Sequence, residues 1–189
     1  MKPDRLNAFT DGVLAIVITI MVLELKFPHE TSFEAVREIL PLLAAYALAF
    51  VNIAIFWNNH HHMMHSARTV TGGVLWANVS LLFWLSLVPL VIRWIGEAGL
   101  TPWPVASYGV VLVLASLSYL LLERALIAAE GERSKIRRAV GSRLKEWLSF
   151  AGYAAAVPAA FLSPYLSIAL YVAVAVMWLI PDRRFEALR

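Results

Sequence analysis

The sequence predicts an all-α membrane protein with six transmembrane helices per subunit. Three observations predict this fold. Hydrophobic residues make up 60% of the 189 positions and charged residues only 15%, which is more apolar than a soluble domain. Six segments approach the roughly 20 apolar residues that a membrane-spanning helix needs. The basic residues gather between these segments, as they do in loops at a membrane surface.

The expected spans lie at about 7–26, 36–58, 73–95, 104–127, 146–163 and 165–181. The last two are short and are separated only by Ser163 and Pro164, so we expect a tight hairpin. No internal repeat is visible, and residues 1–189 are predicted to form one membrane domain. Six helices leave little room for a pore within one subunit, so a pore would form more easily between symmetry-related copies.

The orientation follows from the connection Glu130 to Glu146, which is rich in basic residues: Arg133, Lys135, Arg137, Arg138, Arg143 and Lys145. Such loops remain in the cytoplasm. With six spans, both termini are then cytoplasmic. The basic residues near the two chain ends agree with this: Lys2, Arg5, Arg183, Arg184 and Arg189.

Several function classes lack their sequence signals. The chain has no cysteine, which excludes disulfides, thiolate metal sites and cysteine nucleophiles. Its net charge of +3 comes from loop residues, so nucleic acid is not expected as a partner. There is no Gly-rich phosphate loop, no G-x-S-x-G, no H-E-x-x-H and no Thr-Val-Gly-Tyr-Gly carbonyl filter. We therefore expect neither an enzyme nor a bound cofactor.

The first span carries an ionisable residue, Asp11, more than one turn inside its expected start. A carboxylate at this depth is costly against lipid and should face protein, water or a partner subunit. The alternative is an acid near the helix N-terminus, where the macrodipole favours negative charge.

One face of the first span carries a stripe of residues at helical spacing. At about 100° per residue, Val17 points away from this stripe towards other helices, and Thr19 lies beside it. The stripe consists of Arg5, Phe9, Gly12, Ile16, Ile20 and Leu23. Because the helix is apolar all round, simple packing also explains this pattern.

Four histidines lie at the end of the second span: His60, His61, His62 and His65. His61 and His65 share a helical face, as metal ligands often do. The only other histidine, His29, is expected on the opposite side of the membrane, so a polar interhelical network is the better interpretation and no metal is predicted. Asp11, Asn58 and Asn78 lie at the same membrane level, so we expect them to join His60 in this network.

The pattern Arg5, Phe9, Thr10, Asp11 and Gly12 resembles the R-x-x-x-F-S-D signature of the lysosomal potassium channel family, transmembrane protein 175 and its prokaryotic homologues. The resemblance continues with Ala15, Ile16, Thr19, with the W-x-x-H-H element at Trp57, His60 and His61, and with Asn78, Leu81, Leu82 and Pro89. Thr10 stands where the family usually has serine, which keeps the hydroxyl. The second half of the chain is similar only in hydropathy.

The resemblance implies a prokaryotic plasma-membrane protein that assembles as a homotetramer around a central pore lined by the first helix. It implies an apolar constriction at Ile16, Ile20 and Leu23, with Thr19 as the hydroxyl layer that takes part in selectivity. The supporting polar network would comprise Arg5, Thr10, Asp11, Asn58, His60, His61 and Asn78. The expected partners are the other subunits, the lipid bilayer and permeant potassium.

A ring of aliphatic side chains gates by dewetting and favours the ion that releases water more easily, which is potassium rather than sodium. The resulting expectation is a leak-type potassium channel. The alternative is a proton-coupled or secondary cation transporter in which Asp11 and the histidines from His60 to His65 titrate. Such transporters usually contain broken helices, and the first span has little Gly or Pro interruption. A membrane enzyme is disfavoured because the chain has a single histidine cluster.

Overall fold

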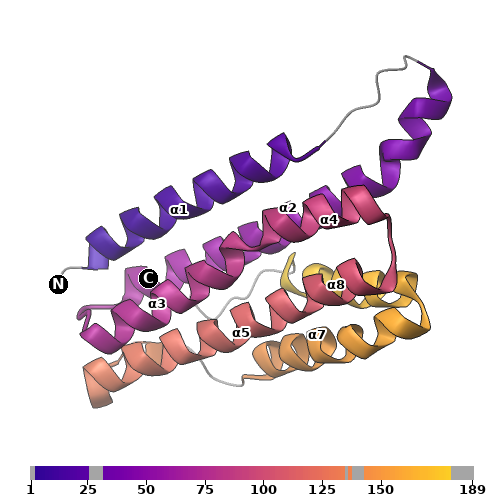
Figure 1. Ribbon diagram of the computed structural model, residues 1–189. Helices are drawn as coiled ribbons and strands as arrows, with labels where there is room; N and C mark the ends of the chain where they lie inside the picture. The colour runs from indigo at the N-terminus through magenta and orange to yellow at the C-terminus, as the bar shows by residue number, and fades with distance from the viewer. Residues whose placement is uncertain (1–2, 26–31, 135, 138–142, 180–189) are drawn as a thin grey trace.

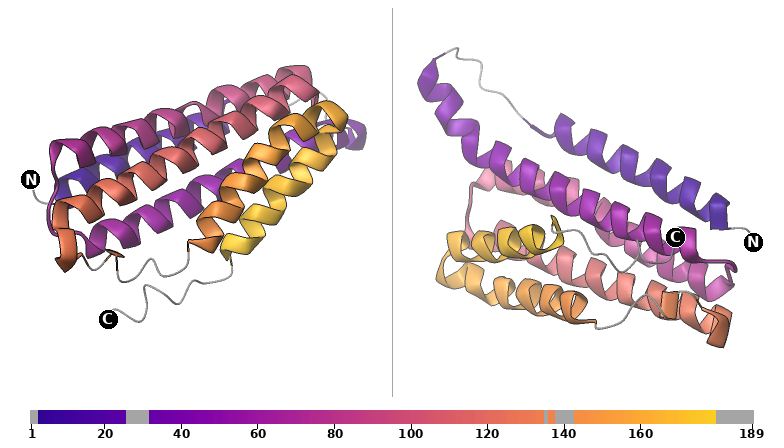
Figure 2. Two further views of the ribbon diagram at one scale, coloured as in Figure 1. Left: turned by 90° about the horizontal axis from the view of Figure 1, so that it is seen from below. Right: turned by 180° about the vertical axis from the view of Figure 1, so that it is seen from behind.

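The computed structural model describes residues 3–25, 32–134, 136–137 and 143–179, and all regular elements in these ranges are helices. Figure 1 shows most of these helices as rods running nearly side by side, and the left view of Figure 2 shows the last two inclined to the others. The helices are α1 (Pro3–Leu23), α2 (Phe33–Ser66), α3 (Gly72–Ser86), α4 (Val88–Ala98), α5 (Pro102–Glu130), a short 3₁₀ turn (Gly131–Arg133), α7 (Leu144–Leu162) and α8 (Pro164–Leu179). Each expected span corresponds to one rod, with α3 and α4 together forming the third.

Four of these rods are long and apolar enough to cross a membrane: α1, α2, α3 with α4, and α5. All six predicted segments are thus helical, and these four have the length and hydropathy of membrane spans, while α8 is a shorter apolar helix of 16 residues. The predicted hairpin of α7 and α8 is confirmed. Ser163 ends α7, and Pro164 begins α8 at the first helical position, where its missing N–H costs nothing.

The third rod is interrupted at Leu87, between α3 and α4. Pro89 cannot donate a backbone hydrogen bond at this point, which breaks the regular helical ladder. Leu87 nevertheless keeps right-handed helical angles, with φ −84° and ψ −11°. The two helices therefore continue in nearly the same direction (Figure 1).

Helix α2 extends beyond its expected end at residue 58 to Ser66. Its last turns are stabilised because Met63 and Met64 are buried in the core. The histidines therefore lie on the helix itself. At the other end Ser32 caps the helix by accepting a hydrogen bond from the Ala35 N–H at 3.2 Å. Figure 1 shows the first turns of α2 leaning away from the bundle. Pro41 lies inside this helix, and proline is a common cause of helix bending.

Helix α1 lies at the edge of the bundle, where it packs against α2, α3 and α4. The two further views agree that α5 lies between the α3 and α4 rod and the α7–α8 hairpin (Figure 2). Helix α1 is therefore covered by its own subunit on one side only.

Several residues used to predict the membrane orientation or to argue against a metal site lie outside the described residues: Lys2, His29, Lys135, Arg138, Arg183, Arg184 and Arg189. The cytoplasmic location of both termini stays a prediction.

Candidate functional site

The first helix has one buried face, although its sequence is apolar all round. The side chains that pack into the subunit recur at helical spacing: Leu6, Thr10, Leu14, Val17 and Met21. Val17 was expected to face other helices, and this is confirmed. Four of the five are hydrophobic, so their burial holds α1 against its neighbours.

The opposite face of α1 is exposed in the single subunit and coincides with the predicted stripe. Ile16, Ile20 and Leu23 are 59%, 43% and 80% exposed. The remaining stripe residues, Arg5, Phe9 and Gly12, are exposed as well. Because this face bears large apolar side chains, we expect lipid or another subunit to cover it, or the face to line a narrow passage.

Thr19 is exposed beside this stripe, and its hydroxyl donates a hydrogen bond to the Ile16 carbonyl oxygen at 2.9 Å. A hydroxyl has one hydrogen and two lone pairs. Since the hydrogen is used within the helix, the oxygen keeps its lone pairs for a group outside it. The local geometry therefore prepares Thr19 to act as an acceptor.

A buried polar cluster joins three helices on the face of α1 that packs into its own subunit. The Asn78 amide of α3 donates from Nδ2 to Thr10 Oγ1 of α1 at 3.0 Å, and Asn78 Oδ1 lies 2.8 Å from His60 Nε2 of α2. All three side chains are almost completely buried. An amide oxygen only accepts, so His60 carries its proton on Nε2. The cluster of Thr10, His60 and Asn78 fixes the position of α1 along α2 and α3.

Asp11 is anchored separately, because its Oδ1 accepts a hydrogen bond from the Trp57 indole N–H of α2 at 2.8 Å. Trp57 in turn lies against His61, with ring centroids 5.8 Å apart, and His61 is stacked with His65 at 6.4 Å. An aromatic row along α2 thus starts at the carboxylate of Asp11.

The structure brings together most of the predicted polar network, but with different pairings. Thr10, His60 and Asn78 form its buried part, while the direct hydrogen bond of Asp11 goes to Trp57. The side chains of Arg5 and Asn58 are exposed and lie outside the buried cluster. Trp57 belongs to the W-x-x-H-H element, but it was not predicted as the partner of Asp11. An indole N–H at the depth of an unpaired carboxylate is the signal that would have identified it.

No group of three or more histidine or carboxylate side chains within the described ranges is arranged to hold a metal ion. His61 is tilted against Trp57 and stacked on His65, so these rings pack against one another.

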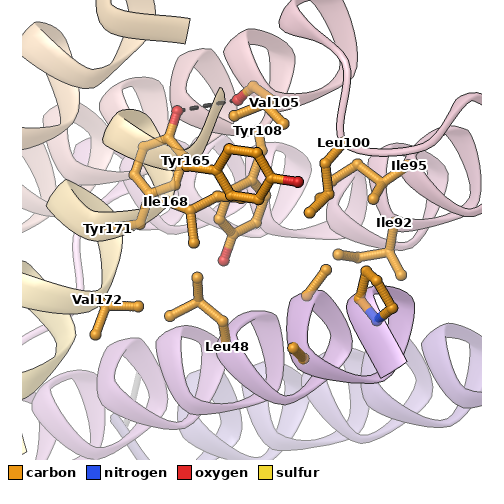
Figure 3. A pocket seen from close by; sticks show the side chains of 13 residues that line it. Leu48, Ile92, Ile95, Leu100, Val105, Tyr108, Tyr165, Ile168, Tyr171 and Val172 are labelled. Atoms are coloured by element: carbon orange, nitrogen blue, oxygen red, sulfur yellow. Dashed lines mark hydrogen bonds between the residues drawn. The ribbon is translucent and has the colours of Figure 1, made fainter. Parts of the chain in front are cut away.

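A separate cavity of about 200 Å³ lies on the far side of α2, between α2, α4, α5 and α8. Figure 3 shows that aliphatic side chains and tyrosine rings line it, among them Leu48, Ile92, Tyr108 and Tyr165. Nearby, the Tyr171 hydroxyl donates to the Val105 carbonyl at 3.0 Å. No residue of α1 lines the cavity, so it is distinct from the exposed stripe.

Comparison with known proteins places these features in a family. The family described as "Endosomal/lysosomal potassium channel TMEM175" matches residues 5–89. A protein of Chryseobacterium sp. (strain P1-3), named a potassium channel, is 47% identical over 98% of this chain and 97% of its own length. A Gallus gallus protein, named an endosomal/lysosomal proton channel, is 29% identical over 51% of this chain and 22% of its own length.

Among solved structures, the crystal structure of a lysosomal potassium-selective channel TMEM175 homolog from Chamaesiphon minutus has the same fold. The superposition gives a TM-score of 0.76 and covers 94% of this chain and 96% of the other, at 23% identity. Because the superposition covers 94% of this chain, the agreement includes α7 and α8, which lie beyond residues 5–89 that match the family description.

Proposed function

This chain belongs to the endosomal/lysosomal potassium channel TMEM175 family, and on that premise we propose that it is the subunit of a potassium channel. In this proposal four copies assemble around a pore lined by α1. The observation that carries it is the exposed stripe of Ile16, Ile20 and Leu23, which lies opposite the face that anchors α1 to its own subunit. A closed ring of subunits gives this stripe a common axis to face.

The composition of the stripe favours a pore over a face that only meets lipid. Thr19 contributes a hydroxyl oxygen beside the stripe. Within the stripe, Gly12 has no side chain, and Arg5 is exposed near its start. Lipid-facing surfaces do not usually carry a charged residue and an oriented hydroxyl together. Helix α1 is also continuous from Pro3 to Leu23, which favours a channel over a transporter with broken helices.

Ion selection follows from dehydration at the apolar ring. Four copies each of Ile16, Ile20 and Leu23 would form successive apolar constrictions, in which water is held weakly and the passage closes by dewetting. Potassium loses its water more easily than sodium and so meets a lower barrier. The four Thr19 oxygens, whose hydrogens are used by Ile16 carbonyls, would replace part of the lost hydration. The passage is passive, and no chemical reaction is required.

The buried cluster gives this pore its rigidity. Thr10, His60 and Asn78 hold α1 against α2 and α3, and the hydrogen bond from Trp57 to Asp11 adds a second attachment one residue further along. A constriction that distinguishes two alkali ions needs side chains held within a fraction of an ångström. We therefore assign the polar residues a supporting role behind the pore.

Proton conduction is the second candidate function. It is favoured by the Gallus gallus relative, which is named a proton channel, and by the row of Trp57, His61 and His65 that leads along α2 from Asp11 of α1. Protons need a chain of hydrogen-bonded groups rather than a passage wide enough for potassium.

Recording from purified protein in planar bilayers tests both functions. With potassium on one side and sodium on the other, we expect unitary currents that reverse at a potential favouring potassium. A pH gradient at constant potassium should leave this reversal potential nearly unchanged. Reversal that follows the pH gradient would instead establish proton conduction, and saturable flux without unitary currents would establish a transporter.

A further inference from the structure

The groove between α1 and α4 links the proposed constriction to a group of charges. It encloses about 490 Å³ and contains side chains of Ile16 and Ile20 together with those of Glu24 and Arg93. Glu24 follows α1 directly and lies one helical turn beyond Ile20, to which its backbone N–H is hydrogen-bonded at 3.2 Å. The apolar stripe therefore continues into a charged end.

Arg93 of α4 lies between two carboxylates at this end. Its Nε is 3.7 Å from Glu24 Oε2 and 3.1 Å from Glu97 Oε1, the latter with hydrogen-bond geometry. The Glu24 side chain is 27% exposed and the Arg93 side chain 51%, so both charges are near water. Together the three residues carry one net negative charge per subunit.

We propose that Glu24, Arg93 and Glu97 form a charged collar around the Leu23 end of the pore, in which Glu24 attracts permeant cations and Arg93 both holds it and limits the field. This inference rests on the proposed function. Four subunits place four such groups around one axis, and a narrow entrance with walls of low dielectric constant focuses their field on the ion path. The negative excess raises the local potassium concentration at the mouth.

These charges could act through their electric field on the ion path, or the ion pair could merely hold α1 against α4 as a structural clasp. The two roles predict different effects of substitution. Glu24→Gln removes the negative excess, whereas Arg93→Gln doubles it, although both break the same ion pair. A field predicts a lower conductance for the first variant and a higher one for the second. A clasp predicts that both variants change in the same direction.

The experiment measures single-channel potassium conductance in neutral-lipid bilayers at about 20 mM and about 1 M KCl, where the screening lengths are roughly 20 Å and 3 Å. At the lower concentration we expect Glu24→Gln to reduce conductance about twofold and Arg93→Gln to raise it by a similar factor. At the higher concentration all three proteins should agree closely. Glu24→Asp keeps the charge and should behave like the unsubstituted channel.

Arg37→Gln is the matched control. Arg37 pairs with Glu34 at 3.8 Å near the start of α2, where both side chains are highly exposed, and this pair does not line the groove. Its removal should leave conductance unchanged at both concentrations. Parallel changes in the Glu24→Gln and Arg93→Gln channels, or changes that persist in 1 M KCl, would overturn the collar. An unsubstituted protein without potassium current would refute the proposed function itself.

Discussion

Replacing Asn78 by leucine should destabilise the subunit by an amount that the geometry sets. Leucine has the same branching and the same number of side-chain heavy atoms as asparagine, so the substitution removes hydrogen bonds without opening a cavity. It leaves two fully buried groups unpaired, the Thr10 hydroxyl and the Nε2–H of His60. Hydrogen bonds between membrane helices average about 0.6 kcal/mol each, whereas an unsatisfied buried group costs about 1–3 kcal/mol. We expect a total loss of about 2–4 kcal/mol for the two groups.

The assay is unfolding of the purified protein in detergent with added lipid, followed through the midpoint of denaturation. Ser80→Ala on the same helix is the matched control, because it removes one hydrogen bond, to Ser118 at 2.9 Å, that lies outside the cluster. Its cost should be below about 1 kcal/mol. Thr10→Ala combined with Asn78→Leu should cost less than the sum of the two single substitutions, since they share a hydrogen bond. If Asn78→Leu is no more destabilising than Ser80→Ala, the cluster does not anchor α1.

Four further predictions concern the constriction, the hydroxyl layer, the second attachment and the assembly. Ile16→Ala should raise conductance because four shortened side chains widen the throat, and Ile16→Asn should raise it more because a polar ring retains water; Val17→Ala should change stability rather than conductance. Thr19→Ala should reduce the preference for potassium over sodium in reversal-potential measurements, while Thr19→Ser should preserve it. Asp11→Ala and Trp57→Phe should each cost about 1 kcal/mol in the unfolding assay and be clearly non-additive together. Native mass spectrometry should give an assembly of about four times the 21.0 kDa chain, and a conducting monomer would contradict the shared pore.

The helices were predictable from hydropathy, but their ends were less so. Helix α2 was expected to end near residue 58, yet burial of Met63 and Met64 continues it to Ser66. The polar tail of the helix is stable because one of its faces is packed. Propensity and hydropathy do not report such packing.

Most residues of the polar cluster could be predicted, because polar groups at the same depth of a membrane form hydrogen bonds with one another. The pairing was not predictable, since it depends on how far α1 is rotated against α2. Thr10 contacts Asn78, whereas the very next residue, Asp11, contacts Trp57. A rotation of about 100° exchanges these neighbours, and a sequence that is apolar all round does not fix it.

The most direct test of the pore uses the natural absence of cysteine. Single cysteines are introduced at Leu23, on the stripe, at Val22, which is exposed but turned by about 100° from it, and at Met21, which is buried. A small cationic methanethiosulfonate reacts with a thiol in water and not with one in lipid. The account predicts that the reagent blocks potassium current through the Leu23→Cys channel and leaves the Val22→Cys and Met21→Cys channels unaffected. Block of the Val22→Cys channel with an unreactive Leu23→Cys channel would contradict a pore lined by this face of α1.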